Sequence, residues 1–224
     1  MELSNFLSFD VFFLLGILVA LEAVLSADNA IALASISKGL EDKRLQSKAL
    51  NIGLILAFVL RIALILTATW VIDYWQFQLL GALYLLWLVF QYFTSEKDQE
   101  GELHGPSYTS LWQVIPLIAM TDLAFSLDSV TAAIAVSEDI WLVVIGASLG
   151  IVALRFMASL FIQWLQEYAH LETAGYITVG LVGMRLLLRV FGLDEMLPEW
   201  LLIILTVVLF VWGFSERQTQ KDVE

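Results

Sequence analysis

Long apolar stretches alternate with short polar segments along the whole chain. The apolar stretches cover residues 9–36, 49–72, 77–94, 111–136, 140–166, 174–191 and 199–214. A helix needs about 20 apolar residues to cross the hydrocarbon core of a bilayer, and most of these stretches are near that length. The pattern therefore predicts an all-α fold, a polytopic membrane helical bundle with about seven transmembrane helices. The first and fourth stretches are long, which favours tilted or interrupted helices there.

Polar residues inside the first and fourth stretches form a motif that occurs twice. Each copy has a carboxylate, a serine four residues later, a second carboxylate six residues later and a small polar residue directly after it. The members are Glu22, Ser26, Asp28 and Asn29 in the first copy, and Asp122, Ser126, Asp128 and Ser129 in the second. Ionisable residues inside membrane spans are costly to bury and usually mark a functional path. We therefore expect these two motifs to carry the function.

The similarity between the two halves extends beyond the acids. The stretch that follows each motif carries one arginine, Arg61 in LILAFVLRIALIL and Arg155 in SLGIVALRFMASL. We interpret residues 9–94 and 111–191 as two copies of a three-helix unit, with an extra helix added at 199–214. An odd number of helices in each copy forces the two copies to be inverted, an architecture that is common among secondary transporters.

Composition supports a membrane protein and excludes several classes of function. Apolar residues make up 60% of the chain, mean hydropathy is +0.84, and charged residues make up 15%, against about 25% in soluble domains. We expect one transmembrane domain, residues 1–224, without a sizeable extramembrane domain. The net charge of −12 argues against nucleic-acid binding, and the absence of cysteine removes disulfides and thiolate ligands. Because no nucleophile-base pair or cofactor fingerprint occurs, we expect no enzyme activity.

The distribution of basic residues predicts the orientation in the membrane. Basic residues fall in alternate connecting segments and in the tail: Lys38, Lys43, Arg44, Lys48, Lys97, Arg217 and Lys221. Segments on the opposite side, around 1–8, 73–76, 137–139 and 192–198, contain no Lys or Arg. The positive-inside rule then places the N-terminus outside and the C-terminus in the cytoplasm. The N-terminal sequence lacks a basic n-region and a cleavage site, so we expect no signal peptide and a multi-pass protein of the cell (plasma or inner) membrane.

The inverted arrangement predicts how the four acids are placed. Glu22 and Asp122 each lie ten or more residues into their spans, near mid-depth. At a rise of 1.5 Å per residue, Asp28 and Asp128 then lie about 9 Å away toward opposite faces, which makes a ladder across the membrane. Residues six apart point roughly 120° away from each other, so one regular helix cannot aim both acids of a motif at one ion. We therefore expect a local helix break between the serine and the last residue of each motif.

The side chains of the two motifs offer only oxygen ligands. Carboxylates, serine hydroxyls, the Asn29 amide and freed backbone carbonyls suit hard divalent cations such as Mn²⁺, Mg²⁺ or Ca²⁺. Zn²⁺ and copper are disfavoured because His104 and His170 fall in or beside loops and cysteine is absent. Met120, two residues before Asp122, is the one nearby soft ligand that would favour Mn²⁺, although packing is the commoner role of a methionine in a helix.

Charge counting suggests how such a site works. The four carboxylates, with Arg61 and Arg155 as counter-ions or gating residues, sum to −2. One divalent cation, or about two protons, neutralises that charge, and we therefore hypothesise electroneutral exchange of one M²⁺ for two H⁺. Arg185 and Arg189 are left out because Arg189 lies close enough to a span end to snorkel and Arg185 is undecided. The structural alternative is a static interhelical pair between an acid and an arginine.

EAVLSADNA in the first span, DLAFSLDS in the fourth and the single arginine in each following span resemble the TerC family of membrane proteins, placed with the LysE transporter superfamily. The resemblance covers nearly the whole chain and implies a seven-span fold with inverted three-helix repeats and an association with Mn²⁺ export. It assigns the metal path to Glu22, Asp28, Asn29, Asp122, Asp128 and Ser129. Because Ser129 stands where the first copy has an asparagine, we expect one half to bind metal more weakly.

These observations predict a proton-coupled exporter of divalent metal that works by alternating access between the two repeats. We expect Mn²⁺ as the transported ion, with Ca²⁺ or Mg²⁺ as alternatives. The expected partners are the cation, protons and the lipid bilayer, and the sequence leaves a homodimer open. Two other classes are kept as alternatives: a non-transporting membrane module that serves as an assembly partner or metal sensor, and a passive cation channel.

Overall fold

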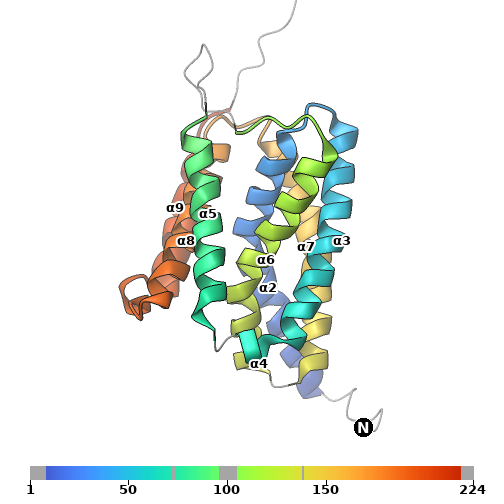
Figure 1. Ribbon diagram of the computed structural model, residues 1–224, viewed down its shortest axis with the longest axis vertical. Coiled ribbons are helices and arrows are strands. Elements are labelled where there is room, and N and C mark those ends of the chain that lie inside the picture. The colour runs from blue at the N-terminus through green and yellow to red at the C-terminus, as the bar shows by residue number, and fades with distance from the viewer. Residues whose placement is uncertain (1–8, 72–73, 96–104, 138, 218–224) are drawn as a thin grey trace, which may run out of the picture.

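The structure, a computed structural model, describes residues 9–71, 74–95, 105–137 and 139–217 and is built from helices (Figure 1). The helices are α2 (Phe9–Lys38), α3 (Lys43–Leu66), α4 (Ala68–Val71), α5 (Trp75–Phe93), α6 (Leu111–Val136), α7 (Ile140–Trp164), α8 (Leu171–Val190), the 3₁₀ helix η1 (Asp194–Met196) and α9 (Glu199–Gly213). Within the described ranges, β pairing is limited to one isolated bridge between Tyr168 and Arg217. The predicted all-α class is confirmed.

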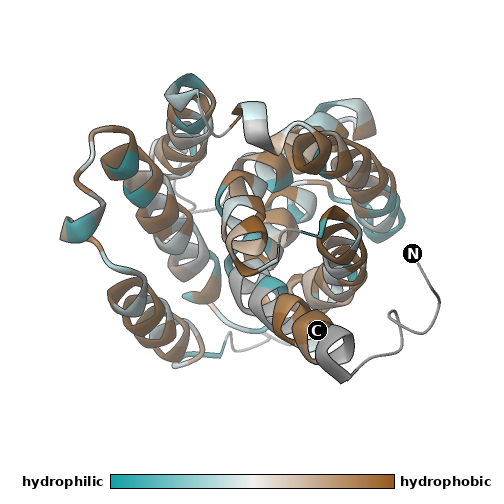
Figure 2. Cartoon of the chain, turned by 90° about the horizontal axis from the view of Figure 1, so that it is seen from below, coloured by the Kyte–Doolittle hydropathy of each residue, from teal (hydrophilic) through white to brown (hydrophobic). Residues whose placement is uncertain are grey.

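Five of the described helices, α3 and α5 to α8, are both long enough and apolar enough to cross a bilayer. Their outward faces carry large apolar side chains, and Ile55, Phe90 and Phe156 are each 66% to 69% exposed. Figure 2 shows apolar colouring on most helices, including those at the rim of the bundle. Such a surface suits contact with lipid, so the chain is a polytopic helical membrane bundle.

Helix boundaries follow the apolar stretches closely, with one large exception. The second stretch was predicted to begin at residue 49, but α3 begins at Lys43. The Asp42 side chain caps α3 by accepting a hydrogen bond of 2.7 Å from the Arg44 amide, so the first turn extends the helix beyond its apolar part. At the far end of α8, Gly192 adopts φ of +68°, a left-handed conformation that glycine supplies after a helix C-terminus.

The helices of the two predicted halves pack reciprocally. Helix α2 packs against α7, α3 packs against α6, and the third helices α5 and α8 pack against each other. Helices α2 and α6 also pack together near the middle of the bundle and run in opposite directions (Figure 1). Helix α9 lies outside α8. The two motif-bearing helices therefore meet antiparallel at the centre.

One end of the bundle carries most basic residues of the described connecting segments, Lys38, Lys43, Arg44 and Arg217 among them, and we call it the basic end. Helix α2 ends there at Lys38, and the Lys38 Nζ atom donates to Glu172 Oε2 at the start of α8 over 2.6 Å. The segment before α6 also lies against this end, where the Tyr108 amide donates to the Gly39 carbonyl at 2.8 Å. These contacts tie α2, α6 and α8 together at the basic end.

Two apolar clusters fill the interior on either side of mid-depth. On α2, α3, α6 and α7 the larger lies toward the basic end, in the C-terminal parts of α2 and α7 and the N-terminal parts of α3 and α6, and it continues along α5 and α8. The smaller lies toward the opposite end, around Leu64, Ile65, Val130 and Val143. Along α3, Ala57 belongs to the first cluster and Leu64 to the second. Residues between these positions are therefore held between two apolar layers.

Candidate functional site

Helices α2 and α6 are continuous through both motifs, so the predicted helix breaks are wrong. In an unbroken helix, residues at positions i, i+4 and i+7 share one face, while position i+6 lies roughly 120° away from position i. Each motif therefore presents a stripe of one acid, one serine and its last polar residue. The second acid of each motif points to another face. The two acids of each motif therefore lie on different faces of one helix and do not both point at one ion.

Arg61 joins the first acids of the two motifs. Its guanidinium donates through Nη1 to Glu22 Oε1 and through Nη2 to Asp122 Oδ1, the second bond being 2.9 Å long. Arg61 is 1% exposed, Asp122 is 0% exposed and Glu22 is 7% exposed. A buried ion pair is stable only when its hydrogen-bonding groups are satisfied, and a single guanidinium can serve two carboxylates because it presents a planar fork of donors.

Polar side chains of the two stripes support this cluster. The Asn29 amide donates to Asp122 Oδ1 at 2.7 Å, so it links α2 directly to α6. The Ser26 hydroxyl donates to Glu22 Oε1 at 3.3 Å, and the Ser126 hydroxyl donates to the Asp122 carbonyl at 2.7 Å. We call Glu22, Ser26, Asn29, Arg61, Asp122 and Ser126 the central cluster. It gathers first acids, serines and the asparagine from both motifs.

Glu22 reaches the central cluster past a glycine of α7. A Cβ atom at Gly150 would stand 2.1 Å from Glu22 Cγ, so the position has no room for any other residue while Glu22 stays in place. Glu22 also lines a cavity of about 10 Å³ together with Ser129, enough for about one water molecule. Asn29 thus lies beside Asp122 and Ser129 beside Glu22, as two antiparallel copies of one motif require.

Asp128 is held by a different helix. Its Oδ2 atom accepts a hydrogen bond of 2.6 Å from Arg185 Nη1, and its Oδ1 atom accepts one from Arg189 Nη1, both from α8. In the sequence, the role of Arg185 was undecided and Arg189 was expected to reach the membrane surface. Their spacing of four residues was the available signal, because it puts both on one face of a helix.

Arg155 does not join the acids, although its position in the second half matches that of Arg61. Its guanidinium bonds to Asn51 Oδ1 at 2.6 Å, to Ser47 Oγ at 3.2 Å and to Ser159 Oγ. Among the described residues, no carboxylate pairs with Arg155. The expectation that it is a counter-ion of the acids is therefore corrected, because it lies on the other side of α7 from α2.

Asp28 differs from the other three acids. Its Oδ1 atom is buried without a hydrogen-bond partner among the described residues, as are Asn29 Oδ1 and Ser129 Oγ. Because Asn29 contacts Asp122, Asp28 lies at a depth similar to that of Asp122, and Glu22 lies near Ser129. The four acids thus occupy two levels instead of the predicted ladder. The three unpartnered oxygens are ligands that remain available.

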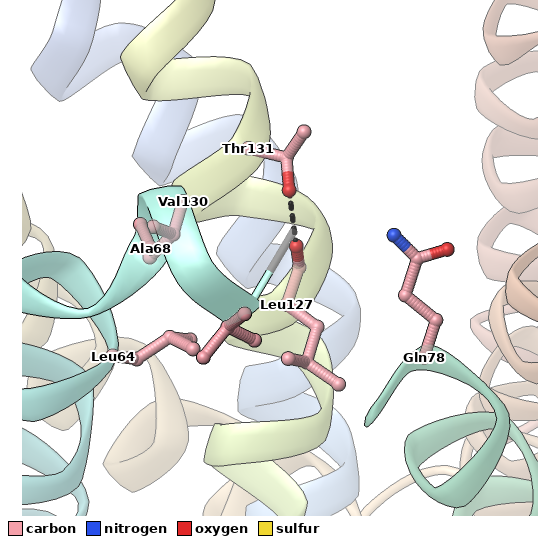
Figure 3. Close-up of a pocket in the computed structure, with 7 residues that line it drawn as sticks. Leu64, Ala68, Gln78, Leu127, Val130 and Thr131 are labelled. Atoms are coloured by element: carbon pink, nitrogen blue, oxygen red, sulfur yellow. Dashed lines mark hydrogen bonds between the residues drawn. The ribbon is translucent and has the colours of Figure 1, made fainter. Parts of the chain in front are cut away.

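Met120 lies away from the acids and is 45% exposed. It lines an apolar groove of about 280 Å³ between α3, α5 and α6, together with residues such as Leu80, Tyr84 and Leu127. The reason is geometric, since two residues apart on a helix means nearly opposite faces. An adjoining small cavity is also mainly apolar, with Gln78 and Thr131 as its polar side chains (Figure 3).

In this arrangement, ion pairs with arginine limit what the carboxylates of the two motifs can bind. Among the described residues, no three His, Cys, Asp or Glu side chains lie close enough to hold a metal ion. Arg61 occupies Glu22 and Asp122, and two arginines of α8 occupy Asp128. A cation can gain these carboxylates only by replacing an arginine. Apart from Arg61 and the amide nitrogen of Asn29, the polar groups of the central cluster offer oxygen atoms as ligands.

Comparison with known proteins gives several matches. Residues 8–221 match the family described as Integral membrane protein TerC family. The chain is 35% identical over 206 residues to the uncharacterized membrane protein YceF of Bacillus subtilis (strain 168), which covers 88% of this chain and 78% of that protein. It is 33% identical over 193 residues to the uncharacterized membrane protein YkoY of the same strain, with 77% and 58% covered.

A more distant relative comes from a plant. The chain is 26% identical over 202 residues to the thylakoid membrane protein TERC, chloroplastic, of Arabidopsis thaliana, with 77% of this chain and 53% of that protein covered. No solved structure matches the chain.

Proposed function

Because the chain belongs to the TerC family of integral membrane proteins, we propose that it exports divalent metal cations, with Mn²⁺ first among them, in exchange for protons. The observation that carries this proposal is the bridge of buried Arg61 to both Glu22 and Asp122. An arginine shared by two carboxylates is an internal substitute for a divalent cation. Displacing it frees two acids at once, at the place where α2, α3 and α6 meet.

The donor set favours hard cations. Glu22, Asp122 and the unpartnered oxygens of Asp28, Asn29 and Ser129 are all oxygen ligands. Mn²⁺, Mg²⁺ and Ca²⁺ take such ligands readily, whereas copper and zinc prefer nitrogen or sulfur. The preference for Mn²⁺ within this group rests on the family resemblance.

The reciprocal packing of the helices supports alternating access. An inverted repeat would pair α2 with α7 and α3 with α6, as observed, and the two motif-bearing helices pack antiparallel. The central cluster lies between one apolar layer toward the basic end and a second toward the opposite end. Loosening one layer while the other stays closed exposes the same acids to one side at a time. We place the basic end in the cytoplasm of a cell-membrane protein.

The charge balance changes with the observed pairing. Asp128 and its two arginines form a separate group with a net charge of +1. Glu22, Asp28, Asp122 and Arg61 form the other group, and its charge of −2 is neutralised by one divalent cation or by two protons. Exchange of one M²⁺ for two H⁺ is therefore kept in the proposal, with Asp28 in place of Asp128 and without Arg155.

Reconstitution into liposomes tests the proposal directly. Vesicles holding a Mn²⁺-sensitive dye and a pH dye should report Mn²⁺ movement coupled to opposite proton movement. Glu22→Gln, Asp122→Asn and Asp28→Asn should each reduce the Mn²⁺ flux at least roughly tenfold, the effect of losing about 1.4 kcal/mol of binding. Glu167→Gln removes an exposed acid outside the spans and should leave the flux unchanged.

Other outcomes point to the other classes. Mn²⁺ flux without opposing proton flux would overturn proton exchange and favour a passive channel. Stabilisation by Mn²⁺ in a thermal unfolding assay, with no flux in vesicles, would favour a metal sensor or an assembly partner. Full flux in all three acid variants would refute the assignment of Glu22, Asp28 and Asp122 to the transport site.

A further inference from the structure

A polar strip lies where α3 and α7 meet near the basic end, outside the central cluster. Arg155 of α7 is fixed there by three neutral acceptors, Asn51 Oδ1 at 2.6 Å, Ser47 Oγ at 3.2 Å and the hydroxyl of Ser159. These acceptors orient the guanidinium but leave its positive charge uncompensated by any described acid. An unpaired charge at the lipid-facing surface of a membrane protein is costly, so a counter-ion is expected.

The arginine points toward the basic end. Ser159 lies one turn further along α7 in that direction. Ser47 lies in the second turn of α3, and α3 starts at the basic end. A long side chain that reaches along the helix in this way brings its charged group toward the headgroup region. The Arg155 guanidinium is thereby directed toward the basic end, the side from which a lipid phosphate of that leaflet would approach it.

Helix α3 adds two more cations to the same strip. Arg44, Ser47, Lys48 and Asn51 follow the spacing i, i+3, i+4 and i+7 on one face, and all four are exposed. The described residues form no ion pair with Arg44 or Lys48. The two acids nearest in the chain, Glu41 and Asp42, stand at the turn before α3, where Asp42 serves as the cap.

The surface becomes apolar directly beyond this strip. On α3, Ile55 is 66% exposed, and on α7, Phe156 is 69% exposed and Val152 is 54% exposed. A group of basic and hydroxyl donors beside an apolar surface matches the two chemically different parts of a phospholipid.

We propose that Arg155, Arg44 and Lys48 bind the phosphate of an anionic phospholipid, whose acyl chains lie along the apolar surface of α3 and α7. A guanidinium can bind a phosphate through two parallel hydrogen bonds, and basic pockets between spanning helices bind acidic headgroups. Ser47 and Asn51 hold Arg155 in position for the headgroup. This site is separate from the acids, and it stands or fails independently of the transport proposal.

Native mass spectrometry of the full chain tests the proposal. The protein is released from a neutral detergent containing equal amounts of phosphatidylglycerol and phosphatidylcholine with identical acyl chains. Wild type should retain phosphatidylglycerol preferentially, and Arg155→Gln should lower this preference about fivefold, as expected for one basic residue near a membrane surface. Arg217→Gln is the matched control, because Arg217 is exposed and already pairs with Glu167.

Three results would overturn the proposal. Equal retention of the two lipids by wild type excludes a selective site. An equal loss in Arg155→Gln and Arg217→Gln indicates general charge attraction. Competition by millimolar inorganic phosphate as effective as that by the lipid assigns the site to a free anion. Should Arg155→Gln fail to fold, Lys48→Gln gives the same readout, and an unchanged preference in that variant also counts against the site.

Discussion

Arg61 and Arg155 stand at matching positions in the two halves of the sequence, yet their surroundings differ completely. Arg61 is buried and binds two carboxylates, whereas Arg155 is partly exposed and binds neutral oxygens. A residue repeated in sequence keeps its chemistry, but its partners depend on what the opposite half presents. Here α6 presents Asp122 to Arg61, while α3 presents Ser47 and Asn51 to Arg155. The arginine of the first half therefore binds acids, whereas the arginine of the second half lies toward the lipid.

The largest expected effect comes from removing Arg61, with the removal of Arg155 as the comparison. Arg61→Gln leaves Glu22 and Asp122 buried without a cation and should lower the free energy of unfolding by about 3–5 kcal/mol. Arg155→Gln loses hydrogen bonds to neutral groups and should cost about 1 kcal/mol in lipid-free neutral detergent. Thermal or denaturant unfolding of the two variants measures the difference. Equal losses in the free energy of unfolding would mean that the two arginines contribute equally to stability despite their different partners.

Neutralising the acids provides the control for that experiment. A triple variant with Arg61→Gln, Glu22→Gln and Asp122→Asn has no buried charge left in the cluster, so most of the lost stability should return. Metal transport should stay absent. A triple variant as unstable as Arg61→Gln alone would indicate that Arg61 stabilises the bundle through packing.

A smaller effect is expected from the glycine beside Glu22. Gly150→Ala places a Cβ atom 2.1 Å from Glu22 Cγ, and relieving this overlap should cost about 1–3 kcal/mol. In a Glu22→Ala background the same substitution should cost much less, because only the Cβ atom of residue 22 remains, at 3.2 Å. Gly180→Ala is the matched control, since its nearest neighbour is a Val89 methyl at 3.6 Å. Equal losses of stability from Gly150→Ala in both backgrounds would show that the cost does not come from contact with the Glu22 side chain.

The smallest effect is expected at the neutral partner of Arg155. Asn51 is exposed and accepts from Arg155 Nε, so Asn51→Ala should cost below about 1 kcal/mol of stability. It should leave Mn²⁺ flux in vesicles at the wild-type level. A loss of flux in this variant would show that Arg155 takes part in transport, as proposed for Arg61.

Much of the fold could be predicted from the sequence because burial in lipid demands long apolar helices. The predicted stretch at 111–136 coincides with α6, and 140–166 exceeds α7 by two residues. The start of α3 was missed because Lys43 and Arg44 are polar, and hydropathy alone does not register a helix that an aspartate caps.

The candidate site was predicted in its members but not in its pairing. Glu22, Asp122 and Asn29 come together as expected, whereas Arg155 lies elsewhere and Asp128 belongs to α8. Pairing depends on the rotation of each helix about its axis, which a repeat of residue types does not specify. The helix breaks failed for a related reason, because an intact helix already aligns the first acid, the serine and the last residue of each motif.

The close approach of Glu22 to Gly150 also supplies a rule for reading related sequences. Every acidic side chain has a Cγ atom, and the position facing it on α7 has no space for a Cβ. An acid in the first span and a glycine five residues before the arginine of the fifth span should therefore change together across the family. A relative with a larger residue at the glycine position should lack the acid, and with it the bridge to Arg61.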